Sequence, residues 1–103
     1  LASHPQADLI KKQQTGHTGL MSFQLKAEPE AAMRLVNELK VFEIGCSWGG
    51  FESLAITPLA GAGEEELKFL QLGEKGRGLI RIHCGLEGAE VLLEDLEQAL
   101  AKI

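Results

Sequence analysis

The segment LIRIHC at residues 79–84 constrains the fold most, because apolar and polar residues alternate along it before a glycine ends the run. A period of two is typical of a β-strand with one covered face. One face carries Ile80, Ile82 and Cys84. The other face carries Leu79, Arg81 and His83. We expect helices to cover the isoleucine face, which leaves Arg81 projecting from an open face.

Two amphipathic helices are predicted beside this strand. The first spans residues 28–40, and its apolar stripe comprises Ala32, Leu35, Val36 and Leu39. The second ends the chain. Its buried stripe is predicted to comprise Ala89, Leu92, Leu93, Leu96, Ala99, Leu100 and Ile103. Its solvated face is predicted to comprise Glu90, Glu94, Asp95 and Glu97.

Further strands are predicted at 20–27, 41–44 and 53–58. The element order predicts an α+β fold, a two-layer sandwich in which helices cover one face of a mostly antiparallel sheet of three to four strands. Residues 59–78 are polar and rich in glycine, and a connection this long is typically functional or mobile. We expect residues 1–18 to be a connecting segment with one short helix, and residues 19–103 to be the domain.

Composition excludes several classes of protein. The 103 residues fit one domain, and the net charge of −5 with scattered Lys and Arg argues against nucleic-acid binding. No apolar run approaches the roughly 18 residues of a membrane span, and no leader pattern opens the chain. Cys46 and Cys84 are therefore expected to be reduced thiols of a cytoplasmic protein. Because the first residue is Leu1 rather than Met, we expect a fragment or a processed product.

Arg81 is the first candidate for a binding role, since its guanidinium group matches a carboxylate or phosphate with two parallel hydrogen bonds. The alternative is an arginine that is simply solvated on an open sheet face. His83 stands beside it, but His4 and His17 lie far away in sequence and Cys84 points to the other face. We expect no metal site, and a local hydrogen bond for His83.

The stretch GCSWGG at 45–50 raises a second question, because glycines offer no surface on which the single tryptophan can be buried. Either Trp48 caps the edge of the core beside a glycine turn, or another group approaches the backbone closely. Ser47 lacks the strand–turn–helix context of a nucleophile. Cys46 has no evident activating partner, so we interpret it as structural. The glycines between 73 and 78 precede a strand and do not form a phosphate loop.

Three segments carry a resemblance that runs through the whole chain. They are SHPQADLIKKQQTGHTGLMSFQL, FEIGCSWGGFESL and GLIRIHCGLEGAEVLLEDLEQAL. In order and spacing they resemble the C-terminal portion of the Cys/Met-metabolism family of pyridoxal-phosphate enzymes. Within the family, Trp48 after Ser47 and His83 in the strand look most like bacterial cystathionine β-lyase.

The resemblance implies the small C-terminal domain of a fold-type I enzyme. Arg81 matches the carboxylate-binding arginine of the family, and Ser47 and Trp48 would lie beside the same substrate carboxylate. The implied reaction is an α,β-elimination of cystathionine to homocysteine, pyruvate and ammonia. The implied partners are a missing large domain, neighbouring subunits of a homo-oligomer such as a tetramer, and an amino-acid substrate.

Other family features are absent from this chain. It has no Tyr, and Lys11 and Lys12 do not match the motif of the cofactor-binding lysine. We therefore expect pyridoxal phosphate to be bound by the missing large domain, no catalytic residue here, and no activity of this chain alone. The alternatives are a stand-alone module that binds amino acids as a regulator, and a purely structural or interaction domain.

Overall fold

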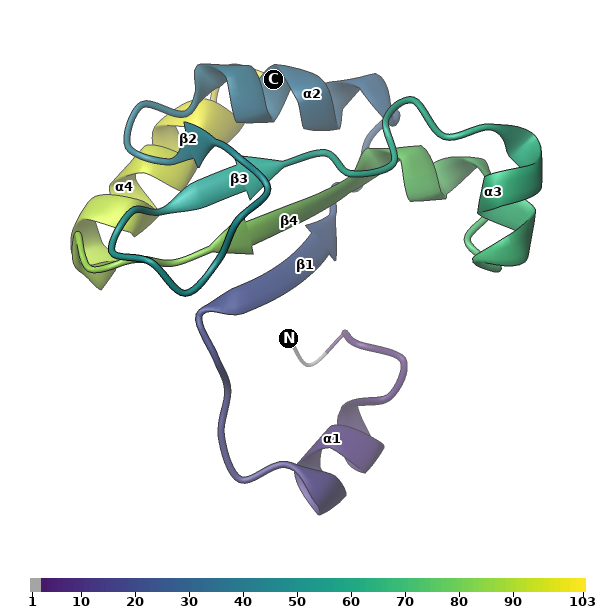
Figure 1. Cartoon of the computed structure of the whole chain (residues 1–103), viewed down its shortest axis with the longest axis horizontal. Coiled ribbons are helices and arrows are strands. Elements are labelled where there is room, and N and C mark those ends of the chain that lie inside the picture. The colour runs from purple at the N-terminus through teal and green to yellow at the C-terminus, as the bar shows by residue number, and fades with distance from the viewer. Residues whose placement is uncertain (1–2) are drawn as a thin grey trace.

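Four short strands form one sheet in the order β1-β4-β3-β2 in the computed structural model, which describes residues 3–103 (Figure 1). β1 (Leu20–Gln24) and β3 (Leu54–Ile56) pair antiparallel with β4 (Leu79–His83), and β2 (Glu43–Ile44) pairs parallel with β3. The strands are shorter than expected, but the α+β class and the mostly antiparallel sheet agree with the prediction.

Two helices, α2 (Glu30–Glu38) and α4 (Ala89–Leu100), lie on one side of the sheet (Figure 1). Ile80 and Ile82 of β4 are buried beneath them, which confirms the predicted isoleucine face. The buried core cluster comprises Ala32, Leu35, Val36, Phe42, Ala55, Ile80, Ile82, Leu92 and Ala99. Since β4 pairs on both sides, this core is centred on the strand that also carries Arg81.

The predicted faces of α4 are wrong in two respects. Several members of the expected buried stripe are exposed, namely Ala89, Leu93, Leu100 and Ile103. Asp95, expected on the solvated face, is 4% exposed. Its carboxylate accepts hydrogen bonds from the backbone N–H groups of residues 40–42, and these bonds compensate the cost of burying it.

The region at 59–78 is also more regular than a long connection. It contains α3 (Glu64–Phe69) and the 3-10 helix η1 (Glu74–Gly78). Leu67 of α3 is 2% exposed and anchors this segment. The N-terminal helix α1 (Ala7–Gln13) has no buried residue and lies away from the sheet (Figure 1). In the part of the chain that the structure describes, no helix is long and apolar enough to cross a membrane.

Candidate functional site

Arg81 lies at the centre of β4, on the face opposite the helices, between Ser22 of β1 and Ile56 of β3. The side chain is half-buried, and its Nη2 donates a hydrogen bond of 2.5 Å to the carbonyl oxygen of Cys46. Its guanidinium carbon is 5.6 Å from the centroid of the Trp48 ring. A cation within about 6 Å of an aromatic ring is attracted by it. These contacts orient the guanidinium group.

The charge of Arg81 is not neutralised by an acidic side chain of residues 3–103. The ion pairs described there use Arg34, Arg77 and Lys102. A guanidinium group has five N–H donors, and the bond to Cys46 occupies one of them. A half-buried cation with free donors is suited to a carboxylate or phosphate ligand.

The loop at 45–53 carries the groups that contact Arg81. Gly49 has a φ of +82°, a left-handed conformation that favours glycine, and this explains the glycine after Trp48. Trp48 is 61% exposed, so it does not cap the core; its ring covers the guanidinium group instead. Ser47 is exposed in the same loop. The structure thus brings Arg81 and Trp48 together, with Ser47 next in the chain.

His83 holds the same loop from the end of β4. Its side chain is nearly buried, and Nε2 lies 3.1 Å from the amide nitrogen of Gly49 and 3.1 Å from the carbonyl oxygen of Gly50. The local hydrogen bond expected for this residue is therefore present.

A second attachment of the loop involves Ser53 and Glu87, two residues that were not predicted from the sequence. The Glu87 carboxylate accepts the Ser53 hydroxyl at 2.6 Å and the Ser53 amide at 2.8 Å. These two bonds hold the pKa of Glu87 below its ordinary value. The Ser53 hydroxyl oxygen in turn accepts the N–H of Gly85 at 2.8 Å. No motif marks a pair this far apart in the sequence.

Gly85 is required where the chain after β4 passes the loop. A Cβ atom at this position would lie 2.1 Å from the carbonyl oxygen of Phe51. The amide of Leu86 donates to that same oxygen at 2.8 Å. Of the two alternatives for the glycines around Trp48, a close backbone approach does occur in this loop, but the glycine that permits it follows β4.

The cysteines do not contribute a reactive pair to this site. Cys46 is an exposed free thiol, and the part of it that contacts Arg81 is the backbone carbonyl. Burial raises the pKa of the half-buried Cys84 thiol, and the Glu87 carboxylate raises it further. Within residues 3–103, no group of three or more His, Cys, Asp or Glu side chains is placed to hold a metal ion.

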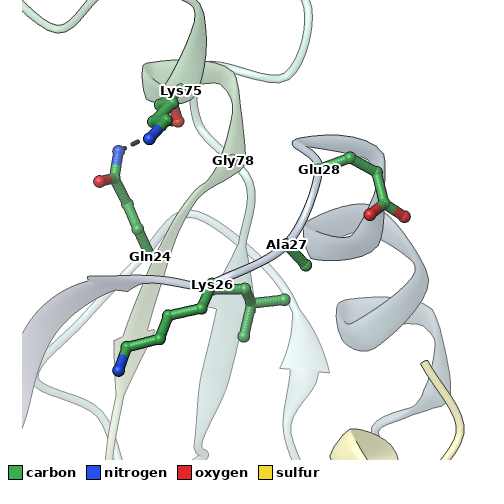
Figure 2. Close-up of a pocket in the computed structure, with 7 residues that line it drawn as sticks. Gln24, Lys26, Ala27, Glu28, Lys75 and Gly78 are labelled. Atoms are coloured by element: carbon green, nitrogen blue, oxygen red, sulfur yellow. Dashed lines mark hydrogen bonds between the residues drawn. The ribbon is translucent and has the colours of Figure 1, made fainter.

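An open hollow of about 580 Å³ lies elsewhere, where the chain leaves β1 (Figure 2). Gln24 donates to the carbonyl oxygen of Lys75 across it at 3.0 Å. Figure 2 shows the charged groups of Lys26 and Glu28 pointing to opposite sides. Since its charged groups do not converge, this hollow is a poorer candidate for a binding site than the surroundings of Arg81.

Comparison with known proteins gives the family. The model of the Cys/Met metabolism PLP-dependent enzyme family matches residues 1–101. Human cystathionine γ-lyase is 43% identical over 97% of this chain, and cystathionine β-lyase of Bordetella avium is 44% identical over 84% of it. L-alanine/L-glutamate racemase of Wolbachia pipientis wMel is 38% identical over 100% of the chain.

The alignments cover 25%, 21% and 25% of those three relatives, so the chain spans about a quarter of their length. The family match nevertheless includes both the loop at 45–53 and strand β4. The chain therefore belongs to the Cys/Met-metabolism family of pyridoxal-phosphate-dependent enzymes.

Proposed function

We propose that this chain is the C-terminal domain of a longer carbon–sulfur lyase, here termed the parent enzyme, and that it binds the substrate carboxylate. The observation that carries the proposal is Arg81: a half-buried guanidinium group, covered by Trp48 and paired with no acidic side chain of residues 3–103. Ser47 contributes its backbone beside the same carboxylate.

The names of the relatives support a carboxylate as the shared ligand. Cystathionine, alanine and glutamate differ in their side chains, and the lyases and the racemase are named for different reactions. What these substrates have in common is the amino group and carboxylate of an α-amino acid. A segment that aligns with all three enzymes is suited to bind that common part, and Arg81 offers the matching donors.

The residues around Arg81 do not fit the cofactor itself. The contacts described for Arg81, Trp48 and His83 include no lysine, and the chain contains no tyrosine to stack on a cofactor ring. We therefore assign pyridoxal phosphate to the part of the parent enzyme outside this chain, and predict that the chain alone is inactive.

The specific reaction that we propose is the elimination of cystathionine to homocysteine, pyruvate and ammonia. Water enters the overall reaction, and the bond broken joins sulfur to the β-carbon of the part that becomes pyruvate. In this reaction Arg81 binds the α-carboxylate, Trp48 shields that ion pair from water, and the Ser47 backbone helps to orient it. The large domain and further subunits of a homo-oligomer complete the site.

The test is the kinetics of Arg81 variants in the parent enzyme. Arg81→Ala removes a charge-assisted contact with two hydrogen bonds, so KM is expected to rise about 10- to 100-fold and kcat/KM to fall. Arg81→Lys keeps the positive charge but loses the planar group that forms two parallel hydrogen bonds, so its effect on KM is expected to be intermediate. Arg34→Ala is the matched control, because Arg34 is exposed and paired with Glu28. Unchanged kinetics in Arg81→Ala would remove Arg81 from the site.

A further inference from the structure

The imidazole of His83 meets two backbone groups of the loop through one ring nitrogen. Nε2 is 3.1 Å from the amide nitrogen of Gly49 and also 3.1 Å from the carbonyl oxygen of Gly50. Without a proton, Nε2 accepts the N–H of Gly49; with a proton, it donates to the oxygen of Gly50. A single nitrogen cannot do both, so the two bonds are alternatives.

The two alternative bonds of His83 involve residues that directly follow Trp48, the residue whose ring covers Arg81. Gly49 directly follows Trp48, and its backbone holds the left-handed turn. His83 and Arg81 extend from the same face of β4. The imidazole therefore connects the turn behind Trp48 to the strand that carries the guanidinium group.

We infer that His83 is a positioning residue that holds Trp48 over Arg81, and that the proton on Nε2 selects whether Gly49 or Gly50 is bound. The inference rests on the proposed carboxylate site. A turn held through Gly50 rather than Gly49 places Trp48 differently on the guanidinium group. The affinity for a substrate carboxylate then depends on the protonation of a residue that does not touch it.

Few charged groups surround the imidazole ring of His83. β1 and β3 place Leu20 and Leu54 opposite His83, and neither strand contains a titratable side chain. The titratable groups of the adjoining segments are Cys46, Glu52, Arg81, Cys84 and Glu87. Of these groups, Glu87 has a pKa below its ordinary value, mainly through its hydrogen bonds with Ser53 and in smaller part through electrostatic attraction to His83.

Amide hydrogen exchange on the 15N-labelled 103-residue chain tests the inference directly. The amide of Gly49 is compared with that of Leu86, which donates to the Phe51 carbonyl in the same region and has no titratable acceptor. Their exchange-rate ratio removes the general effect of pH. Between pH 5 and 8, 15N ring shifts report the proton on Nε2. The ratio is expected to rise about fivefold as Nε2 gains its proton, because one hydrogen bond is lost.

Two variants separate positioning from a purely structural role. His83→Leu removes both bonds, so the ratio is expected to be about fivefold higher at every pH and the emission of Trp48, the only tryptophan, to shift. His83→Gln presents an amide oxygen and an amide N–H at the position of Nε2. It is expected to restore the protection of Gly49 and to abolish its pH dependence. Far-UV circular dichroism establishes that each variant is folded.

Three outcomes would overturn the inference. They are an unchanged ratio in His83→Leu, a ratio that does not follow the ring titration, and a ring that keeps one state throughout this pH range. If His83→Leu does not fold, pH-independent protection in His83→Gln supports the inference and a retained pH dependence contradicts it. No ligand is used, so these results and the kinetics of Arg81 variants can fail separately.

Discussion

At the scale of single residues, Asp95 shows how a buried charge supports the site from a distance. Burial by itself raises the pKa of this carboxyl group, but hydrogen bonds from the amides of Phe42, Lys40 and Val41 outweigh burial. The pKa therefore lies below its ordinary value. These amides lead directly into β2 and the loop that reaches Arg81.

The stability contributed by Asp95 is expected to depend on pH with a definite sign. Because its pKa is lowered in the folded state, the contribution is fully present above about pH 4 and is lost as pH falls through the folded-state pKa. Asp95→Asn is expected to lower the free energy of unfolding by about 2–3 kcal/mol at pH 7. Urea unfolding between pH 7 and pH 2 measures the free energy of unfolding of wild type and of this variant. Glu97→Gln is the control, because Glu97 is an exposed residue of the same helix.

The difference between wild type and Asp95→Asn is expected to shrink below about pH 4. A difference that stays constant down to pH 2 would contradict the assignment of the lowered pKa to this carboxylate.

What the sequence could predict about the site depends on the kind of group. The alternation in β4 was sufficient to place Arg81 on the open face and its isoleucines in the core. Asp95 lies three residues after Leu92 and four before Ala99, so helical spacing already places it on the buried stripe. Its charge suggested the solvated face instead. The Cys46 carbonyl could not be predicted, because every residue has such a group.

At the scale of elements, α4 shows why an apolar residue on a helix need not be buried. Leu92 and Leu93 are adjacent and chemically identical, yet Leu92 is 6% exposed and Leu93 is 58% exposed. Successive residues of a helix point about 100° apart, so a helix that lies on one layer buries only one stripe. Because α4 contains several leucines, the buried stripe predicted from the sequence was wider than the stripe that the helix buries in the structure.

This pair provides a matched test of the helix orientation. Leu92→Ala is expected to lower the free energy of unfolding by about 2–4 kcal/mol, because it removes buried methyl groups and leaves a cavity. Leu93→Ala is expected to change it by less than about 0.5 kcal/mol. Urea unfolding of both variants at pH 7 measures the two effects. Equal costs would mean that α4 is rotated from its described orientation.

Short elements were the hardest to predict. α3 comprises 6 residues, fewer than two helical turns, so no periodicity can develop within it. Its sequence begins with three glutamates, and Leu67 is its one buried residue. β2 comprises 2 residues and depends on its pairing with β3. Tertiary contacts, rather than local pattern, decide such elements.

At the scale of the whole molecule, three large apolar side chains in or beside the loop at 45–53 are exposed to solvent. Trp48, Phe51 and Leu86 are 61%, 76% and 84% exposed. The Leu86 amide donates to the Phe51 carbonyl, so two of these side chains come from segments that touch. Exposed apolar groups beside a polar site are typical of an interaction surface. In the parent enzyme that we propose, the large domain covers this surface.

Hydrogen–deuterium exchange can compare the 103-residue chain with the parent enzyme. If the large domain covers the apolar surface, backbone amides of the loop at 45–53 are expected to exchange at least about tenfold more slowly in the parent enzyme. The α3 segment at 64–69 is the internal reference. Slower exchange confined to the loop would indicate docking at the Arg81 site, because Trp48 and Phe51 both lie in it. Equally slower exchange in the loop and in α3 would instead indicate a general stabilisation of the chain. Unchanged exchange in the loop would mean that the large domain does not cover this surface.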